Sequence, residues 1–439
     1  MLAISQVILS SNLDWKLTPM IIIRQSVKKC IAVLLCVALV GPAALAHGPV
    51  ERVADLTDVA ARLFVADNES GSVLVINLPD ATKRLRLATP PFIISVGRHS
   101  NSRYVFALRG RSSDRDFVTI IDSGFEADGR ARTPYIARSF VAGTSPGGTD
   151  QGNLLTIGGQ PALFMDDDGE IIVFGTNDFG GLAEIPVRRY KLAGPDHLHL
   201  VEAGDNLYVG HLVKGIVQVI DKRSGKEISR ISGCPILYGA TKDATSGRLF
   251  FSCNRHVLVI GSRGNELNKE LGTIPYPGRQ RIGPFLHGRG RVIWGYTEGE
   301  ISELQRLDPA TEPYVIESLP VDASIQQNTS PDGEFLLVYS RSGALDVRDG
   351  GTGELIHQIQ LSKAFNQSYH EHVDKALLPD IRFLGDRVFV SLPHEGRIAE
   401  VALQSGELIR YIDVGGQPTR MVAVAAESIA SAQTSATGR

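Results

Sequence analysis

The chain has 439 residues, with 45 Lys and Arg against 48 Asp and Glu, a globular composition at a length suited to one large repeat domain or two ordinary ones. The net charge of −3 is spread without a long run of one sign, which excludes nucleic acid and an anionic membrane as main partners because both select a basic patch. The 45 glycines and the short runs of Val, Ile and Leu favour a turn-rich β protein over a helical bundle.

The first 46 residues have the three regions of a secretory signal peptide. Basic residues follow Met20, an apolar run covers residues 30–40, and small residues end in an A-x-A cleavage pattern at Ala46. We expect residues 1–46 to be removed on export, with Met20 as the candidate true start, and the mature protein to be periplasmic without a membrane span. An uncleaved anchor is the alternative, but the apolar run is short for crossing a bilayer.

Export would leave two of the four cysteines, Cys234 and Cys253, in an oxidising compartment, where an even pair suggests a disulfide. Two β-like runs flank the turn-rich residues 243–247, so a hairpin folded there is expected to place the cysteines opposite each other. Closing so short a loop is worth about 3 kcal/mol. The alternative, a cysteine metal pair, lacks the C-x-x-C spacing.

A repeated unit organises the rest of the chain: a β run, a Gly turn, a second run of alternating aliphatic residues, and often Asp with another turn. Most copies lie about 40 to 45 residues apart, the period of a four-stranded propeller blade. The sequence therefore predicts an all-β fold, a β-propeller of eight blades with four antiparallel strands each. The eight copies are Leu63–Asn77, Tyr104–Asp122, Ile171–Ile185, Leu207–Asp221, Leu249–Ile260, Val292–Leu304, Phe335–Val347 and Val388–Val401.

The ends of the repeat predict how the ring closes. After the eighth copy, residues 417–425 resemble the first strand of a blade that has no further strands, while the first copy is short at its start. We expect this C-terminal strand to complete blade one and remove the open edge. Residues 47–425 then form a single propeller domain, and residues 426–439 are expected to be a disordered tail.

Two histidine pairs at i, i+2 stand out among the 11 histidines. Alternate residues of a strand face the same side, so each pair can direct two imidazoles at one ion, and each precedes a predicted innermost strand. Zinc accepts histidine nitrogen and carboxylate oxygen in a tetrahedral set. Solvent-facing loop histidines are the alternative. The candidate ligands are His197, His199, His370, His372 and Asp374, with Asp196 as a candidate supporting partner or ligand.

Other polar clusters are interpreted more simply. The acidic run 166–170 lacks the spacing of a calcium loop and is taken as a hairpin turn. The basic stretch 278–291 could hold an anionic ligand, but a solvated loop is the favoured interpretation. Nucleophile elbows, P-loops, dinucleotide-binding glycine loops and H-E-x-x-H motifs are not found in usable context, so we expect a protein that is not an enzyme.

The mature chain resembles the periplasmic β-propeller zinc chaperones of the AztD type, best from about residue 194 onward. The resemblance implies a zinc-binding protein that accompanies an ABC importer and passes the metal to its solute-binding protein. In this chain the segment after Ala46 and the loop 147–153 carry few of the histidines usual in that family. The resemblance is carried by residues 194–199, 233–240 with 247–253, 274–278, 385–391 and 396–401.

The leading hypothesis is therefore a monomeric periplasmic zinc chaperone that exchanges ligands and makes or breaks no covalent bond. The alternative is a scaffold propeller that binds a protein or a small ligand without metal. A lactonase-like propeller enzyme ranks third, because such a site needs acidic and Asn ligands that converge on a metal.

Overall fold

The computed structural model describes residues 56, 58–82, 84–89, 93–98, 102–109, 116–126, 128–143, 154–181, 183–278, 281–296, 301–365 and 378–427. They belong to a compact unit that spans Val53–Arg439. The predicted signal peptide and most of the predicted tail lie outside the described residues.

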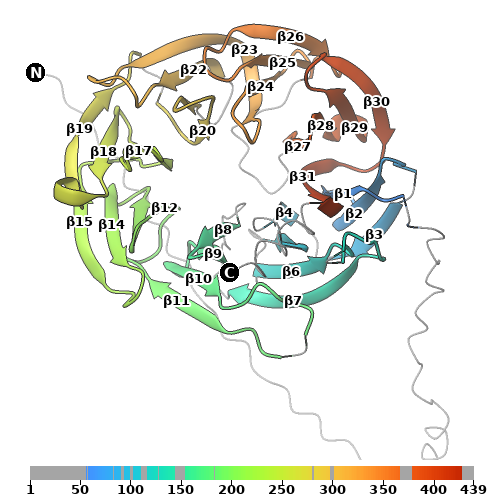
Figure 1. The fold of residues 1–439 in the computed structure, drawn as a ribbon, viewed down its shortest axis with the longest axis horizontal. Coiled ribbons are helices and arrows are strands. Elements are labelled where there is room, and N and C mark those ends of the chain that lie inside the picture. Colours follow the sequence, from blue (N-terminus) through green and yellow to red (C-terminus); the bar gives the residue numbers. More distant parts are fainter. Residues whose placement is uncertain are drawn as a thin grey trace, which may run out of the picture. The chain divides into compact units, whose positions relative to one another are not determined.

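The described residues form eight blades of antiparallel strands arranged in a ring, as predicted (Figure 1). The first strand of each blade lies toward the centre and the fourth toward the rim. Blade 1 contains β31 (Pro418–Ala425), β1 (Ala61–Asp67), β2 (Ser72–Leu78) and β3 (Arg84–Ala88); blade 2 contains β4 (Ile93–Arg98), β5 (Tyr104–Arg109), β6 (Asp116–Asp122) and β7 (Tyr135–Gly143). Blade 3 contains β8 (Leu155–Ile157), β9 (Gln160–Met165), β10 (Glu170–Phe174) and β11 (Val187–Lys191); blade 4 contains β12 (Leu198–Ala203), β13 (Asn206–His211), β14 (Ile216–Asp221) and β15 (Glu227–Ser232).

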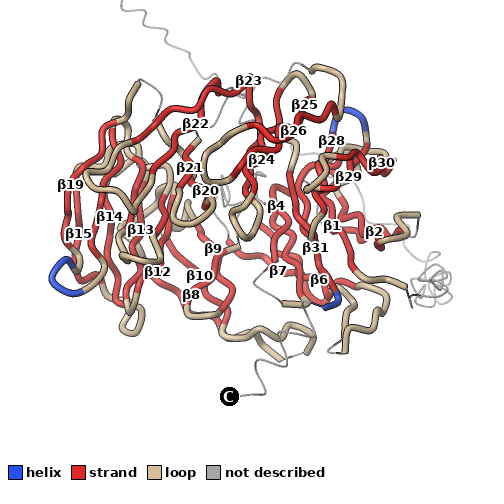
Figure 2. Tube along the Cα trace, turned by 45° about the horizontal axis from the view of Figure 1, so that its top comes forward, coloured by secondary structure: helices blue, strands red, loops and turns tan. Residues whose placement is uncertain are grey.

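The remaining blades follow the same order around the ring. Blade 5 contains β16 (Ala240–Lys242), β17 (Leu249–Ser252), β18 (His256–Gly261) and β19 (Lys269–Pro275); blade 6 contains β20 (Phe285–His287), β21 (Ile293–Gly295), β22 (Ile301–Leu307) and the start of β23 (Ile316–Thr329). Blade 7 contains the end of β23, β24 (Phe335–Ser340), β25 (Ala344–Asp349) and β26 (Leu355–Gln360); blade 8 contains β27 (Ile381–Leu384), β28 (Arg387–Leu392), β29 (Arg397–Ala402) and β30 (Glu407–Asp413). Two short 3-10 turns, η1 (Gly264–Glu266) and η2 (Pro393–Glu395), interrupt the strands, and residues 426–427 after β31 are also helical (Figure 2).

The ring is closed by the C-terminal strand, which confirms that prediction. Strand β31 pairs antiparallel with β1, from Ala61 opposite Ala425 to Asp67 opposite Pro418. Met421 and Val424 of β31 are fully buried. The Asp67 carboxylate also accepts the backbone N–H of Gln417 at 2.9 Å, which fixes the entry of the closing strand.

Blades 6 and 7 differ from the predicted scheme of four separate strands per blade. Strand β23 is 14 residues long and joins both sheets into one of seven strands. Its first part pairs with β22, and its second part, from Ser324 to Thr329, pairs with β24. One strand is therefore both the outer strand of blade 6 and the inner strand of blade 7.

The third blade is displaced from its predicted strands. The repeat pattern placed the paired runs at residues 171–174 and 182–185, whereas β9 and β10 form the central pair and residues 183–186 lie outside any strand. Pro161 within β9 lowers its resemblance to a strand, since proline cannot donate to the ladder. Ile185 is apolar because it packs on the cluster around Phe174 rather than because it pairs.

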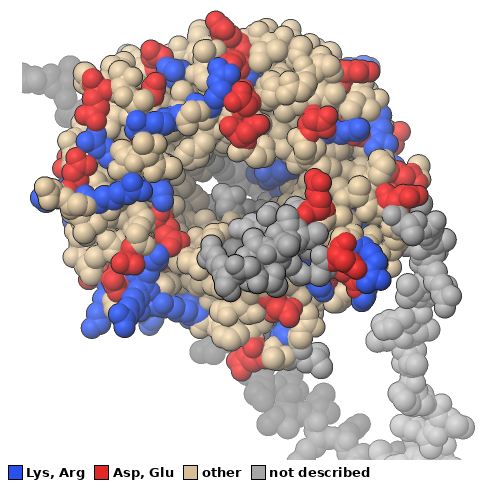
Figure 3. Space-filling model, viewed as in Figure 1, with Lys and Arg blue, Asp and Glu red and all other residues tan. Residues whose placement is uncertain are grey.

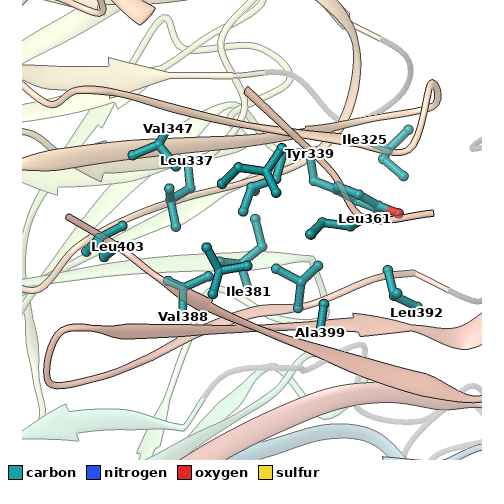
Figure 4. Close-up of a cluster of buried hydrophobic side chains, with 14 residues drawn as sticks. Ile325, Leu337, Tyr339, Val347, Leu361, Ile381, Val388, Leu392, Ala399 and Leu403 are labelled. Atoms are coloured by element: carbon teal, nitrogen blue, oxygen red, sulfur yellow. The ribbon is translucent and has the colours of Figure 1, made fainter. Parts of the chain in front are cut away.

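The hydrophobic core lies between neighbouring blades, where aliphatic faces of adjacent sheets meet. Between blades 7 and 8, Leu337 and Val347 lie in one buried cluster with Val388 and Ala399, and all four are fully buried (Figure 4). Fully burying a Val or Leu side chain is worth about 1.5 to 3 kcal/mol, so each interface contributes to holding the ring together. The outer strands are mostly exposed, as in β3 and β15.

The predicted disulfide is present, but the backbone register around it differs from expectation. The Cys234 and Cys253 sulfurs are bonded, with Cα atoms 4.8 Å apart and both residues buried. Ala240 pairs with Phe251, so the ladder would set Tyr238, not Cys234, opposite Cys253. Residues 234–239 therefore form a loop before β16, and the disulfide ties the start of this loop to the end of β17.

Candidate functional site

The first predicted histidine pair lies at the start of β12, the inner strand of blade 4. His199 is in the strand and His197 comes just before it. Their ring centroids are 5.0 Å apart, so the i, i+2 spacing does bring the two imidazoles to one side of the strand. The His197 side chain is 20 % exposed, so this member of the pair can be reached from the surface.

Asp166 orients the first imidazole from the neighbouring blade. Its Oδ2 atom lies 2.9 Å from Nδ1 of His197, and the Asp166 side chain is 5 % exposed. A carboxylate at Nδ1 fixes the ring orientation and the tautomer of the imidazole. The sequence pattern does not reveal this role, because the acidic run that contains Asp166 is typical of a hairpin turn.

His199 presents a shielded nitrogen. Its Nε2 atom is inaccessible to solvent and has no hydrogen-bond partner among the described residues. Burial, and then the charges of His197 and Arg281, lower the pKa of His199 from 6.5 to about 3. The imidazole is therefore neutral at physiological pH, the form that binds a metal ion.

Tyr238 and Arg281 complete the cluster, which we call the histidine site: Asp166, His197, His199, Tyr238 and Arg281. The Tyr238 ring stacks on His197 with centroids 5.3 Å apart and lies equally far from the His199 ring. The Arg281 guanidinium carbon lies 5.1 Å from the Tyr238 ring centroid. The loop that follows Cys234 carries Tyr238, so the disulfide holds one wall of the site.

Asp196 has a different role from the one predicted. Its carboxylate accepts the backbone N–H groups of Val213 at 2.9 Å and Lys214 at 3.0 Å, and lies 3.8 Å from Nδ1 of buried His211. Asp196 thus fixes the turn between β13 and β14, and the position of supporting carboxylate beside His197 is taken by Asp166. Adjacency in sequence was misleading, because consecutive residues of an extended chain face opposite sides.

The other predicted ligands, His370, His372 and Asp374, lie outside the described residues. Within the part of the chain that is described, no group of three or more His, Cys, Asp or Glu side chains is arranged to hold a metal ion. The described part of the site thus offers two imidazole nitrogens, half of a tetrahedral zinc set.

A separate cavity of about 190 Å³ lies between blades 7 and 8. Three aromatic rings line it: Phe365 stacks on Tyr339 with centroids 6.0 Å apart and lies 5.4 Å from His394. Lys363 and Glu395 also line it and supply charged groups of opposite sign. This cavity was not predicted, because its residues come from distant segments.

The surface carries both signs of charge. On the face shown in Figure 3, Lys and Arg are interspersed with Asp and Glu around the ring, in keeping with the near-neutral composition. No helix among the described residues has the length and apolar character needed to cross a membrane.

The fold and the closing strand define this protein as a β-propeller of eight blades. The chain has an AztD-like fold: it is similar to the structure of apo AztD from Citrobacter koseri, with a TM-score of 0.65 and 20 % identity, over 83 % of this chain and 98 % of that one. A second structure of Citrobacter koseri AztD gives a TM-score of 0.64 at the same identity and coverage.

A more distant similarity extends to an enzyme. The dihydro-heme d1 dehydrogenase NirN, solved in complex with DHE, gives a TM-score of 0.59 at 14 % identity, over 86 % of this chain and 77 % of that one. No family model and no curated protein sequence matches the chain. At these identities the similarities establish the fold alone, so the function must be argued from the site.

Proposed function

We propose that this protein is a zinc-binding propeller of an oxidising, extracytoplasmic compartment, and that Zn²⁺ is its cargo. The observation that carries the proposal is the pair of imidazoles at the histidine site: His199 Nε2 is shielded and has no hydrogen-bond partner among the described residues, and Asp166 orients the adjacent His197. A buried polar atom without a partner destabilises the folded chain by about 1 to 3 kcal/mol, and a bound cation would remove that cost. The Cys234–Cys253 disulfide fits export after removal of a signal peptide over residues 1–46.

The proposed role is delivery rather than catalysis. Two imidazoles leave zinc coordination positions open to other ligands, and ligands can be exchanged there without making or breaking a covalent bond. In line with the resemblance in sequence, the proposed partner is the solute-binding protein of an ABC importer, to which this protein would hand the ion. His370, His372 and Asp374 precede β27 in the chain, and we propose them as additional ligands at the same ion or at a second one.

Zinc binding to the metal-free protein tests the proposal. Equilibrium dialysis should give at least one zinc per chain for the wild type and a large loss of affinity for the H197A/H199A double variant. The matched control is H256A/H357A, which also removes two histidines but leaves the site intact. Stoichiometry below one, unchanged in H197A/H199A, would overturn the proposal. An H370A/H372A/D374A variant tests the additional ligands in the same assay.

The cavity lined by Tyr339, Phe365 and His394 favours a second candidate function, binding of a protein side chain or a small ligand without metal. A propeller of this kind would bind its ligand equally well after H197A/H199A substitution. Its binding would fall with F365A, which removes the central ring of the cavity. The two functions therefore differ in which variant impairs binding.

A further inference from the structure

Arg281 is the unexplained group of the histidine site. Its Nη1 atom is shielded from solvent and has no hydrogen-bond partner among the described residues. The next residue, Ile282, is buried in the core between blades 5 and 6, so the backbone at this point is anchored. A guanidinium held inward with a shielded, unpaired N–H is costly unless something binds it, since hydrogen bonds to charged groups are worth about 1.5 to 3 kcal/mol.

The surroundings of Arg281 identify the charge of the missing partner. The Arg281 guanidinium carbon lies 5.1 Å from the Tyr238 ring centroid, and the centroids of both imidazole rings lie 5.3 Å from the same ring. Among the described residues of the histidine site, the one acidic side chain is Asp166, which contacts His197. Zn²⁺ and Arg281 would together bring three positive charges against the one carboxylate of the described residues, so an anion is the partner that suits Arg281.

The coordination chemistry of zinc and the shape of the guanidinium both favour a carboxylate as the anion. Two imidazoles supply half of the tetrahedral set of zinc, and carboxylate oxygen is an accepted zinc ligand. The planar guanidinium matches a carboxylate in a fork of two hydrogen bonds. A carboxylate can therefore give one oxygen to the zinc while the other accepts from Arg281.

We infer that the histidine site binds zinc together with a small carboxylate anion, which Arg281 holds beside His197 and His199. This inference rests on the proposed function and adds a second ligand to it. The cargo is then a zinc carboxylate rather than the bare ion.

Zinc titration in two buffers tests the inference, with acetate as the probe and chloride at equal ionic strength as the reference. The wild type should bind zinc roughly tenfold more tightly in acetate, a difference of about 1.4 kcal/mol. R281Q should bind zinc equally in both buffers, and R281K, which keeps the charge without the fork, should recover only part of the effect. R255Q is the matched control, because Arg255 is exposed and lies outside the site.

Three outcomes of this titration distinguish failure of the carboxylate inference from failure of the proposed zinc binding. His-dependent zinc binding with equal affinity in acetate and chloride would overturn the carboxylate inference and leave the zinc proposal intact. An acetate effect that persists in R281Q would overturn the assignment to Arg281. Absence of His-dependent zinc binding in both buffers would instead overturn the proposed function.

Discussion

Asp166, just after β9, and His197, just before β12, meet across the interface between blades 3 and 4, with Oδ2 and Nδ1 2.9 Å apart. The contact joins two residues 31 positions apart in the sequence, and the backbone N–H of Asp196 donates to the Asp166 carbonyl at 3.1 Å. These two contacts fix blades 3 and 4 relative to each other at the histidine site. The position of His197 therefore depends on how the two blades pack.

Removing this carboxylate should weaken zinc binding without unfolding the ring. Loss of a supporting carboxylate behind a metal-binding histidine lowers metal affinity about 10- to 100-fold, so D166A should raise the zinc Kd by that factor. D166N, which keeps an acceptor but not the charge, should fall between D166A and the wild type. Calorimetric titration measures both, with D168A in the same turn as the control; equal affinities for D166A and D168A would contradict the role.

The depressed pKa of His199 makes the metal-free protein sensitive to acid. The group has a pKa of about 3 when folded and about 6.5 when unfolded, so between these values the unfolded state binds more protons. Stability should therefore fall as pH decreases below 6.5, by at most about 1.4 kcal/mol per pH unit from this residue. Urea unfolding at several pH values gives the free energy of unfolding as a function of pH. This free energy should fall less steeply with decreasing pH for H199Q than for the wild type.

The control is H357Q on the outer strand β26. Its free energy of unfolding should depend on pH in the same way as that of the wild type. Burial also lowers the pKa of His211 and of His287, so H199Q should reduce the acid sensitivity without abolishing it. Identical slopes for H199Q and the wild type would contradict the shielded environment of His199.

The sequence predicted the features that repeat and missed those that depend on how blades meet. Glycine turns that recur after the third strand predicted the blades. Gly225 and Gly353 in these turns do have positive φ angles, of 71° and 80°. The i, i+2 rule brought His197 and His199 together because it is a property of one strand. Asp166 and Tyr238 could not be assigned, since Asp166 belongs to the preceding blade and Tyr238 to the loop before β16, where the sequence predicted a strand.

The disulfide should stabilise the propeller and hold the Tyr238 wall of the site. The bridge spans 19 residues, for which loop closure is worth about 3 kcal/mol. The C234S/C253S variant should therefore melt at a lower temperature than the wild type in oxidising buffer, and reductant should lower the wild type to the same value. An unchanged melting temperature for the variant would contradict a stabilising bridge.

Ring closure by β31 gives the last prediction. A chain ending before Pro418 would expose the full edge of β1, whose residues 61–67 are all buried in the closed ring. An unpaired apolar edge strand promotes association, so this truncation should form oligomers or aggregates in size-exclusion chromatography. The matched control ends after Glu427 and keeps every residue of β31; it should elute at the same volume as the full mature chain. A monomeric, cooperatively folding product of the shorter truncation would show that blade 1 is stable with three strands and that closure is not required.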